Sequence, residues 1–452
     1  MATKILPKKS PVTHTTTTGT RIGQVLFTEE ELLGFAMETG FIKRRPKKID
    51  PSNLLSAICE EALNGSPSYN DLAANIDSHE QTNPSRQAVA GRVNDEFKDF
   101  MHRLLETLIA RKVGLDGRAA TAPATFRGFK RVLVQDGTII KLPLALFPEF
   151  SGVSNAHSKV CNARIRAVYD LVAGRLVAFS IDPYGKNDLT AAPELEIQEG
   201  DLVLRDRGYL IADEIQRHLD RRAACVYRHK TGVAYLDKTT LQAIDLPALL
   251  RKHGHLDMEV LLNNEARTPV RLVAARVDPE TAELRRMKAR KETKGHNPSH
   301  AVLELMDWSI FITTIDETAA SFQEILAIYG LRWRIEVIFK AWKSHLGFHV
   351  LHRVSERQFK LLLEARLLVI AACANILHRF YAHQLRERCN RRLSLLKFVN
   401  YLSASPANLV RVLGWHSCTP TEQESILKTL AQYCCYDKRK HKNFQEVWES
   451  LA

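Results

Sequence analysis

Apolar residues recur at three- and four-residue spacing from Phe27 to about Val113, with few β-branched runs between them. This is the period of an amphipathic α-helix, so a helical N-terminal region is predicted. Within it, SPSYNDLAANIDSHEQTNPSRQAVAGRV predicts two short helices joined by a polar turn. Asn83 is the expected N-cap of the second helix, with Pro84 at its first position and its body running to Val93. The pair has the form either of a helix-turn-helix that reads the DNA major groove or of a plain helical subdomain.

Beyond Gly128 the pattern changes to short β-type runs separated by turns and helices. Two of these runs predict an antiparallel hairpin. Three strands, a helix, a fourth strand and another helix are the element order of an RNase H-like α/β fold. The expected elements are a strand from Arg131 that turns at Gln135-Asp136-Gly137-Thr138, strands Ala163–Tyr169 and Leu176–Ile181, a helix Leu189–Ile197, a strand Asp201–Arg205 and a helix Ala212–Arg222.

The next segment interrupts this core. Met258–Leu262 and Val270–Ala275 predict strands, Glu280–Lys294 is a charged helix or loop, and Trp308–Thr313 is a further β run. From Ala319 the chain is helical nearly to its end, with breaks expected at the prolines 406 and 420. The predicted domains are a disordered basic tail (1–20), a helical DNA-binding domain (21–125), an RNase H-like catalytic core (126–227 and 311–350), a mostly β insertion (228–310) and a helical C-terminal region with a possible role in dimerisation (351–452).

Charge narrows the class of partner. The chain has 452 residues and a net charge of +13, and its segment from Leu351 onward carries 16 basic and 8 acidic residues. Such an excess indicates a polyanionic partner, most often a phosphate backbone. No long apolar run and no secretory signal are present, so we expect no membrane partner and a cytoplasmic, nucleoid-associated protein. The eight cysteines form no CxxC pair, which argues against a zinc site near His416 and Cys418.

The segment IYGLRWRIEVIFKAWKSHLGFH carries the most informative pattern. At about 100° per residue, five polar residues fall within about 80° of a helix surface, and apolar residues occupy the other side. Pairs four residues apart, such as Arg332–Glu336, are also common on any exposed helix, so spacing alone leaves both interpretations open. The polar stripe consists of Tyr329, Arg332, Glu336, Lys340 and Lys343, and the apolar side of Leu331, Ile335, Ile338, Trp342 and Leu346.

The spacing Tyr-x2-Arg-x3-Glu-x6-Lys resembles the Y-R-E-K signature of bacterial transposases of the insertion-sequence-four group. Those DDE transposases also carry an Asp in a D-G-T context and a second Asp in D-R-G-Y, which here are Asp136-Gly137-Thr138 and Asp206-Arg207-Gly208-Tyr209. About 130 residues then separate Asp206 from Glu336, which leaves room for the insertion. The resemblance covers roughly residues 128 to 350, with all three acids present in order.

This resemblance implies that Asp136, Asp206 and Glu336 are the catalytic residues and ligands of two Mg²⁺ ions, for which Mn²⁺ would substitute. Two such ions would activate a water and stabilise the leaving 3′ oxygen of a phosphodiester. The family pattern also implies DNA contacts, with Trp308 either stacking on a flipped base or serving as a core residue. The DNA-binding set is Tyr329, Arg332, Lys343, Lys340, Trp308, Arg207 and Tyr209, of which Lys340 is added for its place on the stripe and is not part of the signature. The charge of the basic run Arg285–Lys294 fits either contacts to the DNA backbone or an ordinary solvated face.

The implied activity is binding to the terminal inverted repeats of an insertion sequence, cleavage through a hairpin intermediate, and joining of the ends to target DNA. A homodimer on double-stranded DNA is expected. Two other classes remain open. A non-catalytic DNA-binding regulator would have lost one of the acids, and none is lost here. A structure-selective nuclease would share the acids but would not need the Tyr-Arg-Lys stripe.

Overall fold

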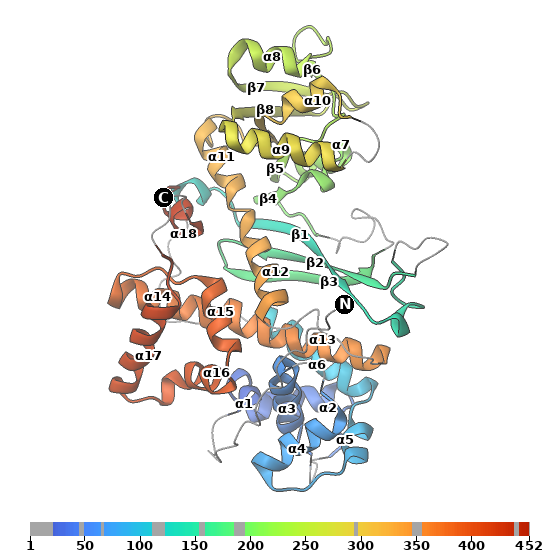
Figure 1. Cartoon of the computed structure of the whole chain (residues 1–452), viewed down its shortest axis with the longest axis vertical. Coiled ribbons are helices and arrows are strands. Elements are labelled where there is room, and N and C mark those ends of the chain that lie inside the picture. Colours follow the sequence, from blue (N-terminus) through green and yellow to red (C-terminus); the bar gives the residue numbers. More distant parts are fainter. Residues whose placement is uncertain are drawn as a thin grey trace, which may run out of the picture.

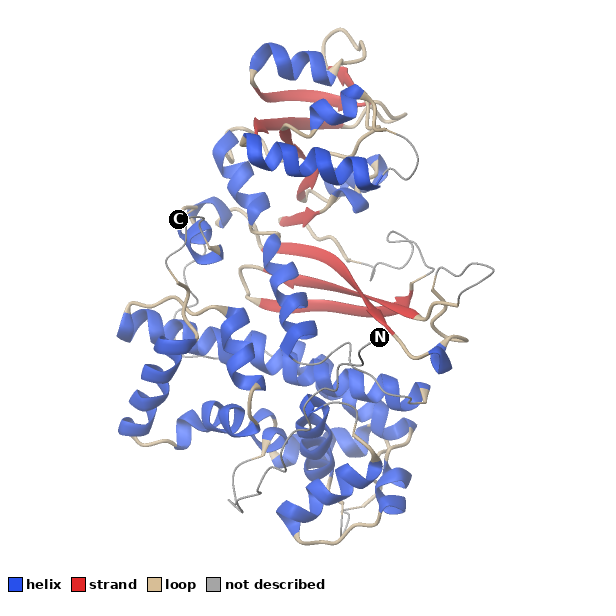
Figure 2. Cartoon of the chain, in the orientation of Figure 1, coloured by secondary structure: helices blue, strands red, loops and turns tan. Residues whose placement is uncertain are grey.

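The computed structural model describes residues 21–44, 49–64, 67–110, 123–152, 159–184, 195–292, 297–345, 355–437 and 443–451. Helices occupy the lower part of the molecule and a large sheet runs through its middle and upper parts (Figure 2). The predicted disordered tail, 1–20, lies outside the described residues. So does most of the helix predicted over Leu189–Ile197, whose last residues, 195–197, are not helical.

The N-terminal region is helical, as its three- and four-residue spacing predicts. Three phenylalanines join its helices, since the ring of Phe41 lies 4.9 Å from that of Phe97 and 5.4 Å from that of Phe100. The second helix of the expected pair begins later than predicted. The helices of this N-terminal region are α1 (Ile22–Leu26), α2 (Glu29–Glu38), α3 (Pro51–Asn64), α4 (Tyr69–Glu80), α5 (Arg86–Arg92) and α6 (Asp95–Ala110).

The N-cap of α5 is Ser85, so the prediction of Asn83 is wrong. The Ser85 hydroxyl accepts a hydrogen bond from the Ala88 N–H at 3.1 Å, which satisfies one of the first free donors of the helix. Asn83 adopts a left-handed conformation (φ 46°), and its N–H donates to the Asp77 carboxylate at 2.7 Å. It therefore belongs to the turn between α4 and α5.

One mixed sheet, built from strands between Arg131 and Thr313, follows the N-terminal helices. Its strands are β1 (Arg131–Lys141), β2 (Asn162–Asp170), β3 (Arg175–Pro183), β4 (Asp201–Arg205), β5 (Ala224–Arg228), β6 (Tyr235–Asp237), β7 (His255–Leu262), β8 (Pro269–Arg276) and β9 (Trp308–Thr313). Their order is β3-β2-β1-β4-β5-β9-β8-β7-β6. The pairs β1·β4 and β4·β5 are parallel and the other pairs are antiparallel. The predicted hairpin is confirmed as β2 and β3, and α7 (Ala212–Asp220) confirms the helix that follows β4.

Strand β1 does not turn at Gly137, which corrects the prediction made for that motif. The ladder with β2 continues without a break through Asp136↔Ala167, Gly137↔Arg166 and Thr138↔Ile165. The β-branched residues that follow Gly137 favour this extended conformation. Asp136 therefore lies in the middle of a strand that has partners on both sides.

The insertion is mixed α/β, and its helices hold more residues than its strands, so the description as mostly β is wrong. The two predicted strands are confirmed as parts of β7 and β8. Antiparallel pairing of β8 with β9 and of β9 with β5 makes the insertion a direct extension of the central sheet. Figure 1 shows it as the upper part of the molecule. Its helices are α8 (Leu246–His253), α9 (Pro279–Glu292) and α10 (His300–Leu305).

Two helices link the sheet to the helical regions. α12 (Trp333–His345) crosses in front of the sheet (Figure 1) and packs against β1. α13 (Glu356–Ala371) packs against α3 and α6 and is mostly buried from Phe359 onward. The remaining helices are α11 (Phe322–Gly330), α14 (His378–Cys389), α15 (Leu395–Ser403), α16 (Pro406–Leu413), α17 (Pro420–Tyr433) and α18 (Phe444–Glu449).

The predicted breaks at the prolines 406 and 420 are the first residues of α16 and α17. None of the described helices is both long and apolar enough to cross a membrane.

Candidate active site

Asp136 lies at the centre of β1 with its carboxylate half-enclosed. The Gly137 N–H donates to Oδ1 at 2.8 Å, and the side chain keeps 21% of its surface exposed. Burial raises the pKa of this carboxyl to about 6, although Arg332 and the Gly137 N–H pull it down. The negative charges of Glu336 and Asp206 raise the pKa further, so all three acids share one electrostatic environment.

Asp206 follows β4, the parallel neighbour of β1. The pairing Gln135↔Arg205 brings it beside Asp136, because each acid comes one residue after its partner in the register. The Tyr329 hydroxyl donates to Asp206 Oδ1 at 3.2 Å. Burial raises the pKa of Tyr329 above its ordinary range, so the hydroxyl keeps its proton and remains a donor.

A buried polar network adjoins Asp206. Arg205 donates to Glu214 at 2.8 Å and to the Tyr227 hydroxyl at 3.0 Å, and His218 lies 3.0 Å from the same hydroxyl. Burial lowers the pKa of His218 to about 3, and the charge of Arg205 adds to this effect, so the imidazole is neutral. These contacts attach the end of β4 to α7 and β5, which restricts the backbone that carries Asp206.

Glu336 comes from α12, but the polar stripe does not lie on one continuous helix as predicted. α11 ends at Gly330 and α12 begins at Trp333, and the backbone bonds between them join residues three apart, as in Arg332 N–H to the Tyr329 carbonyl (3.0 Å). Arg332 lies at this tighter turn and is buried. Four residues of the apolar side are buried as predicted, namely Leu331, Ile335, Ile338 and Trp342, while Leu346 lies outside the described residues.

Arg332 joins the acids. Its Nη1 donates to Asp136 Oδ2 at 3.0 Å and its Nη2 donates to Glu336 Oε1 at 2.6 Å. Its side chain is only 11% exposed, and the guanidinium carbon lies 5.5 Å from the centre of the Tyr329 ring. Burial alone would lower the pKa of Arg332, but Tyr329 and the carboxylates of Asp136 and Glu336 raise it, so the guanidinium is permanently charged.

The donor set of this site fits hard divalent cations. It offers only carboxylate oxygens, which Mg²⁺ and Mn²⁺ prefer, and it already attracts one positive group between two of the acids. Within the described part of the chain, no three His, Cys, Asp or Glu side chains are close enough to form a ready-made metal site. The guanidinium of Arg332 holds Asp136 and Glu336 instead.

The other residues of the predicted set differ in accessibility. Lys340 and Arg207 are exposed, whereas Lys343 is half-buried, and burial lowers the pKa of its ammonium group. Tyr209 is buried, and its hydroxyl lies close to Gly137. A Cβ atom placed on that glycine would be 3.8 Å from the hydroxyl oxygen. Tyr209 therefore packs one acidic motif against the other and does not face solvent.

Trp308 and Trp333 differ in exposure, and the exposed one is the tryptophan that the prediction omitted. Trp308 is 6% exposed in the core of the insertion, beneath the Arg276 guanidinium, which lies 5.7 Å from its ring. This burial favours the core interpretation over base stacking. Trp333 is 61% exposed and directly follows Arg332. A helical wheel places the Trp333 side chain next to the polar stripe. This position was the sequence signal that could have identified Trp333 as an exposed aromatic residue near the acids.

The basic run of α9 is only partly free for DNA. Arg285 donates to the Trp308 carbonyl at 2.9 Å, and Arg286 pairs with Glu283 and Asp307, so both arginines stabilise the insertion. Lys288, Arg290 and Lys291 are exposed, and the last residue of the predicted run, Lys294, lies outside the described residues.

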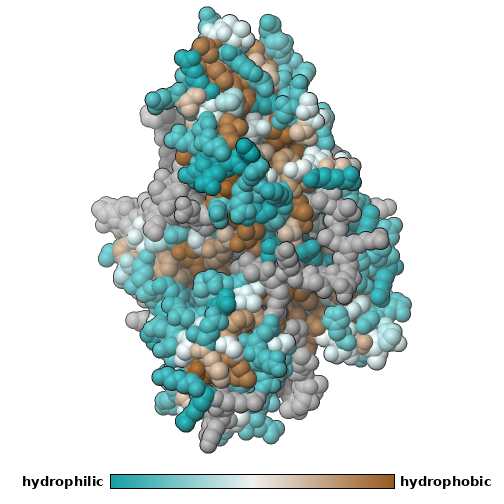
Figure 3. Space-filling model, turned by 180° about the vertical axis from the view of Figure 1, so that it is seen from behind, coloured by the Kyte–Doolittle hydropathy of each residue, from teal (hydrophilic) through white to brown (hydrophobic). Residues whose placement is uncertain are grey.

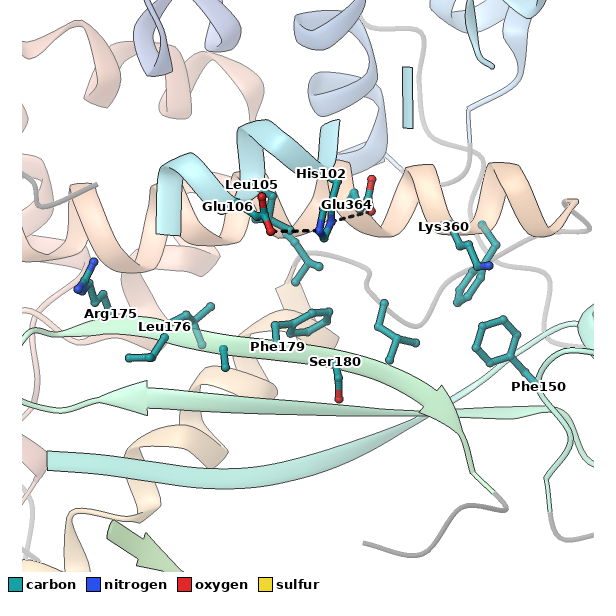
Figure 4. Close-up of a pocket in the computed structure, with 15 residues that line it drawn as sticks. His102, Leu105, Glu106, Phe150, Arg175, Leu176, Phe179, Ser180, Lys360 and Glu364 are labelled. Atoms are coloured by element: carbon teal, nitrogen blue, oxygen red, sulfur yellow. Dashed lines mark ion pairs between the residues drawn. The ribbon is translucent and has the colours of Figure 1, made fainter. Parts of the chain in front are cut away.

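A cavity of about 680 Å³ lies away from the acids, between β3, α6 and α13 (Figure 4). His102 approaches Glu106 and Glu364 at its rim, each at 3.5 Å, while most of its lining is apolar. Apolar side chains also gather at middle height on the reverse face of the molecule (Figure 3). None of the three acids lines this cavity, so it is separate from the candidate active site.

Comparison with known proteins gives a consistent family. Residues 127–372 match the family described as "Transposase DDE domain". The chain is 25% identical over 393 residues to the transposase for insertion sequence element IS231D of Bacillus thuringiensis subsp. finitimus, with 81% of each chain covered. It is 20% identical over 380 residues to the transposase for IS1151 of Clostridium perfringens, covering 77% of this chain and 78% of that one. A cryo-EM structure of a piggyBac transposase synaptic complex with hairpin DNA aligns with a TM-score of 0.40 at 12% identity, covering 94% of this chain and 86% of that one.

Proposed function

The chain belongs to the DDE transposases of bacterial insertion sequences, and from this premise we propose that Asp136, Asp206 and Glu336 form its catalytic centre. We propose that it binds the terminal inverted repeats of its element, cuts the phosphodiester backbone there and joins the ends to target DNA. The core that carries the acids would be RNase H-like, which the order β3-β2-β1-β4-β5 supports.

One observation carries this proposal: Asp136 and Glu336, from distant segments, share the guanidinium of Arg332, and Asp206 lies at the end of the strand next to that of Asp136. Asp136 and Asp206 come from neighbouring parallel strands, and Glu336 comes from the helix that crosses the sheet in front of them (Figure 1). The side chains of Asp136 and Glu336 are 21% and 31% exposed, so a substrate can reach them. Clustered carboxylates repel one another, and natural proteins keep such an arrangement where a cation or a reaction requires it.

The protein's own side chains and backbone would hold the substrate and orient the acids. The Gly137 N–H and the Tyr329 hydroxyl each fix one carboxylate oxygen. Lys340, Lys343 and Arg207 would contact phosphates near the cleaved bond. Such contacts raise the affinity for DNA whatever its base sequence. Divalent cations bound by the three acids would supply activation of water and stabilisation of the leaving oxygen.

Trp333 is our candidate for a contact to an unpaired base. Its indole is exposed beside Arg332, and stacking on a base is worth about 1–3 kcal/mol, enough to hold a base outside the duplex during a hairpin step. Trp308 would instead hold the insertion together. The exposed lysines of α9 would contact the backbone from the insertion.

Recognition of the element's ends would fall to the N-terminal helices. α4 and α5 have the size and connection of a helix-turn-helix, and Arg86 and Gln87 at the start of α5 are exposed, where a recognition helix contacts base edges. Dimerisation on paired ends, with the C-terminal helices as an interface, is part of the same proposal.

A cleavage assay tests the assignment. The protein is incubated with Mg²⁺ or Mn²⁺ and a duplex that carries the terminal repeat of its element, beside Glu336→Gln and the control Glu424→Gln, which changes an exposed carboxylate paired with Lys428. We expect the wild type and Glu424→Gln to nick and join the duplex equally, and Glu336→Gln to bind it without cutting. Undiminished cleavage by Glu336→Gln would refute the catalytic assignment.

A further inference from the structure

Arg332 places a positive charge where the proposed catalytic centre needs one. Two of its donors hold Asp136 and Glu336 at 3.0 and 2.6 Å, and its side chain is 11% exposed. We infer that Arg332 is a built-in counter-ion that closes the metal site of the DNA-free protein, and that it must leave both carboxylates before divalent cations bind. This inference rests on the proposed function, since it takes these acids as the metal ligands.

The contact neutralises charges that would otherwise repel one another. Asp136, Asp206 and Glu336 bring three negative charges to one partly enclosed site, and a guanidinium between two of them reduces the repulsion. The geometry uses one nitrogen for each acid, so both acids lose an oxygen to Arg332. A cation that needs oxygens from the same acids therefore competes directly with the guanidinium.

One donor of the bridging guanidinium remains unused. The Nε of Arg332 is buried and has no hydrogen-bond partner among the described residues. A phosphate group would offer the guanidinium a bidentate acceptor, the arrangement that arginine fits best. The turn that joins α11 to α12 carries Arg332, so its side chain is attached at the break between two helices and not within one.

These two sets of partners exclude each other, and this couples DNA binding to metal binding. When a phosphate of the DNA end takes the guanidinium, Asp136 and Glu336 become free to bind cations. By thermodynamic reciprocity, the DNA end then raises the affinity for metal by the same factor as metal raises the affinity for the DNA end. The protein would thus assemble its cutting centre only on a bound end.

Mn²⁺ binding measured by electron paramagnetic resonance on the DNA-free full-length protein tests this inference. The variant Arg332→Met keeps the length of the side chain but removes its charge. The control Arg357→Ala removes a guanidinium from an exposed ion pair with Asp95. We expect Arg332→Met to bind Mn²⁺ at least about tenfold more tightly than the wild type, within the usual range of coupling between sites, and Arg357→Ala to match the wild type.

A second readout covers the risk that Arg332→Met folds poorly. Without metal it should unfold at a lower temperature than the wild type, and saturating Mn²⁺ should raise its midpoint by more than it raises that of the wild type, because a tighter ligand stabilises the fold more. Arg332→Lys keeps a charge that cannot bridge both acids, so its Mn²⁺ affinity should fall between the other two. Equal or weaker Mn²⁺ binding by both Arg332 variants would overturn the inference.

Two further arms separate this inference from the proposed function. Glu336→Gln in the Arg332→Met background should abolish the gain in affinity. If Mn²⁺ binding is indifferent to Glu336 in every background, the proposed metal site itself is wrong. If the wild type binds Mn²⁺ through Glu336 but Arg332→Met shows no gain, the site stands and the counter-ion role is wrong. A duplex with a pre-cut terminal repeat should tighten Mn²⁺ binding in the wild type and not in Arg332→Met.

Discussion

Replacing Asp136 by asparagine should stabilise the metal-free protein while it abolishes cleavage. Burial raises the pKa of this carboxyl from 3.8 to about 6, a change that already includes the help of Arg332 and the Gly137 N–H. At 1.36 kcal/mol per pH unit, keeping the group ionised in the folded state costs about 3 kcal/mol at neutral pH. Asparagine has nearly the same shape and carries no charge, so we expect a gain on the order of 1–3 kcal/mol.

The sign of the pH dependence follows from the raised pKa. Below pH 3.8 the carboxyl is protonated in the folded and the unfolded chain, and Asp136 imposes no penalty. As the pH rises from 3.8 through about 6, the unfolded chain loses its proton first, and the free energy of unfolding falls. The advantage of Asp136→Asn should therefore be small near pH 4 and complete above pH 7.

Urea unfolding in EDTA at several pH values between 4 and 8 measures this difference. Asp257→Asn is the matched control, because Asp257 holds the buried Arg271 through two hydrogen bonds of 2.6 and 2.7 Å. That variant should be less stable than the wild type at neutral pH, since it leaves a buried guanidinium poorly paired. An Asp136→Asn protein that is less stable than the wild type at pH 7.5, or a gap that does not change with pH, would refute the reasoning.

Three further predictions concern the active site and the two tryptophans Trp308 and Trp333. Metal-dependent cleavage should rise with pH through about 6, because protons and metal compete for the Asp136 carboxylate, and a rate that is flat from pH 5 to 8 would contradict this. Trp308→Ala should destabilise the insertion by about 3–5 kcal/mol in thermal or urea unfolding, as expected for a buried tryptophan. Trp333→Ala should change stability by no more than about 0.5 kcal/mol, leave the first nick intact and slow the hairpin step; a comparable loss of both steps would argue against base stacking.

The elements that carry the acids could be predicted because their signals are local. The runs that became β1 and β4 are rich in Val and Leu, as buried strands are, and a parallel register then brings Asp206 beside Asp136. The spacing of Tyr329, Arg332 and Lys343 around Glu336 predicts a role for this acid through the family signature that it resembles. Each of these signals lies within one short segment, so it can be recognised without knowledge of the tertiary structure.

Features that depend on tertiary contacts could not be predicted in the same way. Helical periodicity runs through Leu331 and Arg332, yet the chain tightens there and Arg332 turns toward two acids. Trp308 and Trp333 are alike as residues, and only packing decides that one is core and the other exposed. The predicted N-cap of α5, Asn83, and the observed one, Ser85, are both residue types that cap helices well. The turn before α5 requires a left-handed conformation at Asn83, which leaves Ser85 as the cap. The insertion contains more helix than predicted, because a short apolar run is compatible with both a strand and a helix.

The most direct test of the account is where metal binds on the protein–DNA complex. Crystals of the protein with a terminal-repeat duplex and Mn²⁺, with diffraction recorded at the manganese absorption edge, would locate the ions without reference to activity. We predict anomalous peaks within about 2–2.5 Å of carboxylate oxygens of Asp136, Asp206 and Glu336, with Arg332 moved onto a phosphate. Peaks that do not contact these three side chains, or a bound duplex with Arg332 still between Asp136 and Glu336, would contradict it.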